Sequence, residues 1–248
     1  MTDRYAIVDQ LMGKLTLEQK VGQLFTQAFY GSLVVPDIVR TIRDLNCGGL
    51  RITQYFRGFR RYARPGQAQE AFDKLSPRDM RPDLIDDRKD LLCSSPYLSI
   101  GQYSEVLRRL KEIAADRPYD IPLHMMLDQE GDSSFDCLRG GMRYFPSQFG
   151  YARRGSEKLV HDVARAVATQ LSAVGFNMIN SPVVDVVFNP QATYIRTRAF
   201  GTDVETVCRM AVAAMKGYHE GGLIASAKHF PGRGATDVDA HHLSLIHI

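Results

Sequence analysis

Charged side chains follow three apolar segments of the chain, each at the point where the segment ends. They lie in residues 128–132, 180–185 and 227–234. One aspartate after a strand is usually a helix cap, but a cap is a weaker explanation when three successive segments end this way. The carboxyl ends of parallel strands share one rim of a sheet, so we expect these side chains to form a common polar site.

The loop after the last segment is the most densely charged, and it permits three interpretations. Asp239 and His241 could form a carboxylate–imidazole pair, in which the carboxylate fixes the ring tautomer and raises its basicity for acid–base work. The loop could instead be ordinary polar surface, or it could hold a metal ion. A metal would use the ligand-type side chains Asp237, Asp239, His241 and His242. No helical HExxH spacing supports that last alternative.

Two basic residues open the same loop. Lys228 and His229 directly follow an apolar segment, so we expect their stems to be largely desolvated. A buried lysine needs a carboxylate partner or a polar ligand. Asp128 and Asp185 are the candidate partners, and ligand hydroxyls are the functional alternative.

Arg198 lies in residues 195–201, between the Asp185 loop and a capped helix. It could flank that helix in an ion pair with Asp203. The alternative is an arginine that reaches into the rim, where it binds hydroxyls or orients a carboxylate.

Alternating strands and helices must position these groups. Four apolar runs have the length of strands and are apolar on both faces, which is typical of parallel strands buried between layers. The runs are Gly48–Thr53, Ile121–Leu127, Phe176–Pro182 and Leu223–Ala227. Their alternation with helices predicts an α/β fold with a parallel sheet or barrel.

The helices between these runs carry caps and apolar stripes. Thr16 with Gln19, and Thr202 with Glu205, form capping-box patterns. The first box precedes Val21, Leu24 and Phe25. Three further stripes follow helical spacing: Tyr103, Leu107, Leu110 and Ile113; Val160, Val163, Val167, Leu171 and Val174; and Val207, Met210, Ala211, Ala214 and Tyr218.

The composition is that of an ordinary globular protein. The 248 residues carry 31 basic and 28 acidic side chains, a formal net charge of +3, with 44% hydrophobic and 24% charged residues. These values exclude a disordered or fibrous chain, and they give no global case for a nucleic-acid partner. The sequence has no membrane-length apolar run and no apolar signal-peptide core, so we expect a cytoplasmic protein without a membrane partner.

Residues 54–99 interrupt the alternation with a segment rich in arginine and aromatic residues. We interpret them as an insertion packed over the mouth of a barrel, within one domain that spans residues 1–248. The alternative is an anion- or nucleic-acid-binding module built on this segment.

Five motifs in this order resemble glycoside hydrolase family 3, in its N-terminal TIM-like barrel. They are residues 15–24, 128–131, 181–186, 198–201 and 228–232. The last is the most specific, and its continuation to Asp239 and His241 is similar to the β-N-acetylglucosaminidase branch. The resemblance implies a (β/α)8 TIM-like barrel, of which this chain holds only the N-terminal portion.

The resemblance also implies a retaining exo-β-glycosidase that removes terminal β-linked N-acetylhexosamine by double displacement. Its substrate is a small carbohydrate, and no cofactor or metal is needed. Sugar hydroxyls would be bound by Asp128, Arg198, Lys228 and His229. Asp239 and His241 match the family's acid–base dyad, in which His241 moves the proton. A β-glucosidase or another exo-β-glycosidase of the family is the alternative, and a metal-dependent hydrolase is the rival from another class.

The nucleophile of this family is an aspartate on a later strand, beyond Ile248. We therefore expect a C-terminally truncated chain in which four strands form an open half of a barrel. We also expect that these 248 residues do not turn over substrate by themselves.

Overall fold

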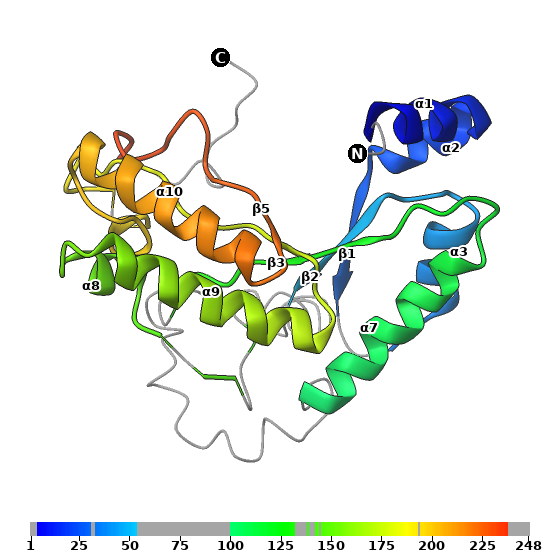
Figure 1. Ribbon diagram of the computed structural model, residues 1–248, viewed down its shortest axis with the longest axis horizontal. Helices are drawn as coiled ribbons and strands as arrows, with labels where there is room; N and C mark the ends of the chain where they lie inside the picture. Colours follow the sequence, from blue (N-terminus) through cyan, green and yellow to red (C-terminus); the bar gives the residue numbers. More distant parts are fainter. Residues whose placement is uncertain are drawn as a thin grey trace, which may run out of the picture.

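The chain forms one parallel sheet with helices packed against it (Figure 1). The computed structural model describes residues 4–30, 33–53, 100–131, 138, 142, 143, 145–192 and 194–237. Within these residues the sheet has five strands in chain order, and every neighbouring pair is parallel. The strands are β1 (Thr26–Tyr30), β2 (Gly49–Thr53), β3 (His124–Leu127), β4 (Met178–Ile179) and β5 (Ile224–Ala225). This progression is that of an incomplete (β/α)8 barrel, so the expected α/β class is confirmed.

Helices connect the strands and bury one face of the sheet. Figure 1 shows α9 and α10 side by side toward one end of the sheet, and α3 with α7 toward the other. Leu50 and Ile52 on β2, and Met125 and Leu127 on β3, alternate along their strands and join the core under these helices. The helices are α1 (Arg4–Lys14), α2 (Leu17–Gln23), α3 (Pro36–Arg43), α7 (Ile100–Ala115), α8 (Gln148–Ala152), α9 (Glu157–Val174), α10 (Val204–Glu220) and the 3₁₀ helix η2 (Arg196–Arg198).

The long helices form for the reasons that their sequences indicate. On α9, the Ser156 side chain caps the first turn by accepting a hydrogen bond from Leu159 N at 3.1 Å. Gly175 ends the helix in the left-handed conformation, at a φ of 117°. The predicted stripes of α7, α9 and α10 are confirmed, because their residues are buried or partly buried in the core. A Cβ at Gly217 would lie 2.3 Å from His161 O, so this glycine allows α10 to approach α9 closely.

The two predicted capping boxes have different outcomes. Thr16 and Gln19 form both hydrogen bonds of the box at the start of α2, as expected. The box predicted at Thr202 and Glu205 is wrong by one residue. Asp203 is the N-cap of α10, and its carboxylate accepts a hydrogen bond from Thr206 N at 2.8 Å. An aspartate caps as well as a threonine, and its charge also favours the helix N-terminus.

The expected strand boundaries need correction. The prediction began with the run at residues 48–53 and missed β1, which has the mixed-polarity sequence TQAFY. β1 lies at the edge of the sheet, where Phe29 is buried but Thr26 and Gln27 are exposed, so it carries no continuous apolar signal. The runs at residues 176–182 and 223–227 contain strands of only two residues each.

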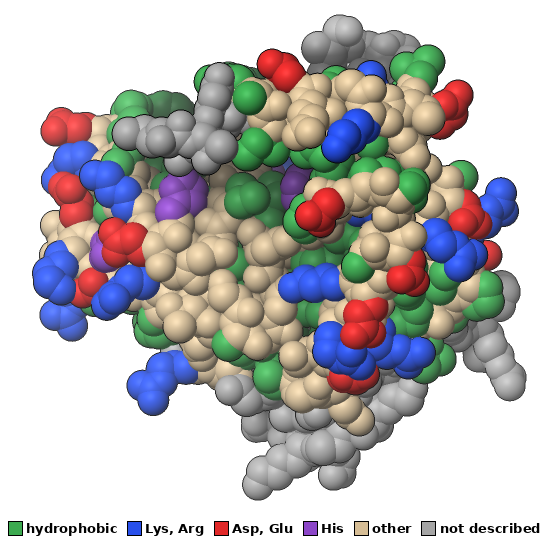
Figure 2. All heavy atoms as spheres, turned by 45° about the vertical axis from the view of Figure 1, so that its right-hand side comes forward, with side chains coloured by type: hydrophobic (Ala, Val, Ile, Leu, Met, Phe, Trp, Pro, Cys, Tyr) green, Lys and Arg blue, Asp and Glu red, His purple; other side chains and the backbone are tan. Residues whose placement is uncertain are grey.

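The second face of the sheet is partly exposed among the residues that the structure describes, although Met126 on β3 is buried there. Ile224 on β5 is 54% exposed, although the sequence predicted a strand buried on both faces. Val21, Leu24 and Phe25, which follow the first capping box, are also exposed. In Figure 2, backbone and uncharged polar side chains fill much of the visible face, hydrophobic side chains are scattered among them, and most charged side chains lie toward the two sides. The proposed insertion at residues 54–99 lies outside the described residues.

Candidate active site

Polar side chains meet where β3, β4 and β5 end. Past β4 and β5, the two backbones stay joined by Lys228 N to Pro182 O at 3.0 Å and by Val184 N to Lys228 O at 2.6 Å. This pairing brings the segment after β5 beside the segment after β4. Charged groups from both segments therefore face the residues that follow β3, as expected for the carboxyl rim of a parallel sheet.

Five alternating charges form a continuous ion-pair chain on this rim. Asp128 accepts from Lys228 Nζ at 2.8 Å and is also paired with Arg51. Lys228 Nζ is in turn paired with Glu130. Glu130 receives Arg198 through two contacts, Nε to Oε2 at 2.6 Å and Nη2 to Oε1 at 3.2 Å. We refer to Arg51–Asp128–Lys228–Glu130–Arg198 as the ion-pair chain.

The acids and bases of the ion-pair chain differ in exposure. The Asp128 and Glu130 side chains are 8% and 2% exposed, whereas Arg51, Lys228 and Arg198 are 25%, 17% and 24% exposed. The carboxylates therefore lie beneath the basic groups. An incoming ligand would meet mainly hydrogen-bond donors at this surface.

Both carboxylates are held in the ionised form. Burial raises the pKa of Asp128, but Lys228 and Arg51 outweigh burial and hold this pKa far below its usual value. Burial also raises the pKa of Glu130, and Lys228 and Arg198 outweigh it in the same way. At neutral pH both carboxylates of the ion-pair chain are therefore negatively charged.

A second pair lies beside the ion-pair chain. His229 Nδ1 lies 2.7 Å from Asp185 Oδ2, and Asp185 Oδ1 accepts from Arg233 N at 2.6 Å. Burial raises the pKa of Asp185, but these two hydrogen bonds and the nearby charges outweigh it and lower the pKa. Because Nδ1 faces Asp185, a ligand would meet His229 through Nε2.

A buried glutamine fixes the backbone that carries Arg198. Gln148 donates to Arg198 O at 2.7 Å and to Val183 O at 3.1 Å, and it accepts from Val183 N at 3.2 Å. Arg198 also donates to Tyr194 O at 3.0 Å. These bonds tie η2 to the segment after β4, so the arginine side chain is directed at Glu130.

The structure brings the four proposed sugar-binding residues together: Asp128, Arg198, Lys228 and His229. Of the two acids proposed as partners for Lys228, Asp128 fills that role, whereas Asp185 pairs with His229. The alternative pairing of Arg198 with Asp203 is wrong, because Asp203 is committed to the cap of α10 and Glu130 is available as a buried, charge-assisted partner.

The proposed acid–base dyad, Asp239 and His241, lies outside the described residues. The same holds for His242. Asp237 is described, is exposed, and is hydrogen-bonded to Asn189. The described residues contain no cluster of three metal-ligand side chains.

Sequence reasoning missed two members of the ion-pair chain, Arg51 and Glu130. A feature of the sequence indicates each of these two residues. Arg51 is the charged residue in the apolar strand sequence GLRIT, and an unpaired charge there would be costly. Glu130 is two residues from Asp128 in the same motif, so the two side chains can lie on one side of an extended segment.

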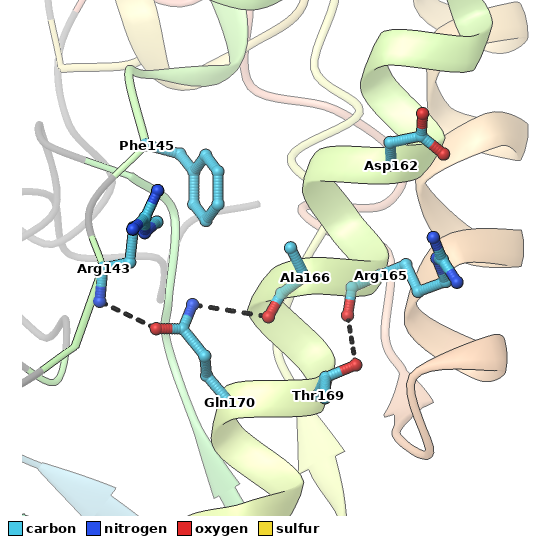
Figure 3. Close-up of a pocket in the computed structure, with 7 residues that line it drawn as sticks. All are labelled: Arg143, Phe145, Asp162, Arg165, Ala166, Thr169 and Gln170. Atoms are coloured by element: carbon cyan, nitrogen blue, oxygen red, sulfur yellow. Dashed lines mark hydrogen bonds between the residues drawn. The ribbon is translucent and has the colours of Figure 1, made fainter.

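A separate depression of about 420 Å³ lies between α9 and the segment before α8. Figure 3 shows that Arg143 and Arg165 lie on opposite sides of it and do not converge. The amide of Gln170 is used by Arg143 N and Ala166 O, and the Thr169 hydroxyl donates to Arg165 O. The side chains of Gln170 and Thr169 thus bond to the local backbone, and the two arginine side chains do not form a common site.

Comparison with known proteins identifies the family of the chain. Residues 91–245 match the family model described as the glycosyl hydrolase family 3 N terminal domain. The chain is 29% identical over 155 residues to β-hexosaminidase A of Pseudoalteromonas piscicida, covering 61% of this chain and 26% of that protein. It is 36% identical over 124 residues to β-hexosaminidase LpqI of Mycobacterium tuberculosis, covering 49% of this chain and 31% of that protein.

The fold shows the same relationship. A glycoside hydrolase family 3 β-N-acetylglucosaminidase from Paenibacillus superposes with a TM-score of 0.71 and 28% identity, over 92% of this chain and 35% of that one. The chain thus spans about a quarter to a third of the length of these relatives. No helix in the described part of the chain has the length and apolarity needed to cross a membrane. The chain belongs to glycoside hydrolase family 3.

Proposed function

We propose that the chain carries the terminal-sugar subsite of a β-N-acetylhexosaminidase. The observation that carries this proposal is the ion-pair chain at the carboxyl rim. It fixes the positions of the donors Lys228 and Arg198 above the buried carboxylates of Asp128 and Glu130. Support comes from the relatives named β-hexosaminidase and from the solved β-N-acetylglucosaminidase that shares the fold.

The donors and acceptors of the rim suit a polyhydroxylated ligand. Lys228 and Arg198 have more N–H donors than the contacts with Asp128 and Glu130 use, so further N–H groups can reach sugar oxygens. The two oxygens of Asp128 have about four lone-pair sites, and Lys228 and Arg51 each donate to one of them. Neighbouring sugar hydroxyls can therefore be bound by Asp128 and the basic groups together.

Bond cleavage requires residues beyond this subsite. We assign His241 as the group that protonates the glycosidic oxygen and Asp239 as the carboxylate that orients its ring. A nucleophilic aspartate from a later strand would attack the anomeric carbon and form a glycosyl-enzyme, while the protonated aglycone leaves. Water, deprotonated by His241, then releases the sugar with net retention of configuration.

Isothermal titration of the chain with N-acetylglucosamine tests the subsite without requiring turnover. We expect saturable binding to the wild-type chain. We expect Asp128→Asn to weaken it about ten- to a hundredfold, because hydrogen bonds to an ionised acceptor contribute about 1.5–3 kcal/mol. Asp44→Asn is the matched control, since Asp44 pairs with Arg43 on an exposed part of the surface.

The sugar used in the titration separates the hexosaminidase from the glucosidase. Preference for N-acetylglucosamine over glucose supports the proposal, whereas preference for glucose favours the β-glucosidase alternative. Equal weakening by the Asp128 and Asp44 variants, or no binding by the folded wild-type chain, would refute the assignment of this subsite.

A further inference from the structure

Arg51 is a basic group of the rim that the family motifs do not include. It lies on β2, in register with Met126 of β3, two residues before Asp128. Its neighbours Leu50 and Ile52 are buried in the core on one face of the sheet. Because side chains alternate along a strand, Arg51 projects from the other face. From there it reaches the Asp128 oxygen that Lys228 does not contact.

We propose that Arg51 is a positioning residue of the sugar subsite, fixing the orientation and the charge of Asp128 from β2. This inference rests on the proposed function. Asp128 follows β3, and two cations hold it from strands on either side of β3. Lys228, which follows β5, donates to Oδ1, and Arg51 on β2 donates to Oδ2. With either cation absent, the buried carboxylate could rotate about its side-chain bonds and would lose one of the two cations that pair with it.

The proposal assigns different tasks to the two cations. Lys228 is shared between Asp128 and Glu130, so its charge is divided between two carboxylates. Arg51 pairs with Asp128 through the oxygen that Lys228 does not contact. Arg51 is also more exposed than Lys228, at 25% against 17%.

The alternative is that Arg51 only stabilises the sheet. A purely structural role predicts loss of stability without a change in the titration of Asp128. A positioning role predicts that Arg51→Met raises the pKa of Asp128, because burial remains and one of the two opposing cations is gone. The two roles are therefore separated by a direct measurement on the Asp128 carboxyl group.

The experiment compares the wild-type chain with Arg51→Met, Arg51→Lys and the control Arg43→Met. The Asp128 side-chain carboxyl ¹³C shift is followed by NMR as the pH is lowered. N-acetylglucosamine binding is measured over the same pH range. We expect Arg51→Met to protonate Asp128 at higher pH and to bind the sugar about tenfold more weakly at neutral pH. Arg51→Lys should cause smaller changes in both the Asp128 titration and sugar binding, because lysine keeps the positive charge but lacks the planar guanidinium group.

An unchanged Asp128 titration in folded Arg51→Met would overturn the proposal. So would a shift of the same size in Arg43→Met, since Arg43 pairs with Asp44 on the surface. If Arg51→Met does not fold, Arg51→Gln, which also removes the positive charge, is titrated in its place and judged by the same criteria. If the wild-type chain binds no sugar, the proposed function fails, and the NMR titration still shows whether Arg51 controls Asp128.

Discussion

Glu130 offers the most informative perturbation of the ion-pair chain. Its side chain is 2% exposed and lies between two cations, Lys228 and Arg198. Glu130→Gln keeps the shape and one acceptor oxygen but removes the charge. Removing one partner of a buried ion pair costs about 3–5 kcal/mol, since it leaves charge uncompensated. We expect about 3 kcal/mol here, because the glutamine oxygen still accepts one hydrogen bond and Asp128 still faces Lys228.

Urea unfolding followed by circular dichroism measures this loss. In thermal unfolding of a chain of this size, a loss of 3 kcal/mol corresponds to a decrease in Tm of about 6–12 °C. The matched control is Glu157→Gln, whose partner Arg209 lies 3.1 Å away with both side chains about half exposed. An exposed pair of this kind contributes about 0–1 kcal/mol.

The pH dependence provides a second test of the Glu130 account. The folded-state pKa of Glu130 lies below its ordinary value of 4.5, so its carboxylate stabilises the fold above the unfolded pKa. That contribution is lost as the pH falls through the folded-state pKa. The difference in stability between wild type and Glu130→Gln should therefore be largest near neutral pH and decrease in acid. A Glu130→Gln chain that loses no more stability than Glu157→Gln would refute the account.

Three further predictions concern the caps, the core and the dyad. Asp203→Ala should lower the free energy of unfolding by about 1 kcal/mol, while Thr202→Ala should change it by less than about 0.5 kcal/mol; the reverse order in urea unfolding would restore Thr202 as the cap. Leu107→Ala should lower the free energy of unfolding by about 2–5 kcal/mol, because Leu107 is fully buried, whereas Leu24→Ala at an exposed site should change it little. Equal decreases in Tm for the two variants would contradict the described core. In a protein that also carries the expected nucleophile, His241→Ala should slow cleavage of alkyl glycosides more than that of nitrophenyl glycosides, since good leaving groups need less protonation; equal losses in kcat would remove His241 as the acid.

The sequence predicts the alternation of elements better than their ends. The apolar stripes of α7, α9 and α10 are confirmed because their spacing directly reflects the buried face of each helix. β1 was missed because an edge strand needs few apolar residues. The cap of α10 was displaced by one residue because Thr202 and Asp203 are both good N-caps, and local geometry selects between them.

The candidate site shows a similar division. Asp128, Lys228 and His229 were found from their positions at strand ends, which the fold class assigns to one rim. The ion-pair partner of Arg198 could not be assigned from the sequence, because two acids, Glu130 and Asp203, are possible partners. Tertiary packing decides between them: Gln148 holds the Arg198 backbone where the side chain reaches Glu130. Arg51 was not predicted as a site residue, because the sequence of its strand was interpreted as apolar on both faces.

A crystal structure of the chain with N-acetylglucosamine tests the central claim most directly. The account predicts a sugar ring on the carboxyl rim, with its oxygens about 2.7–3.2 Å from Lys228 Nζ and from an oxygen of Asp128. The Arg51 contact with Asp128 should be retained in that complex. A sugar bound elsewhere, for example in the depression beside α9, with the ion-pair chain unoccupied at saturating ligand, would contradict it.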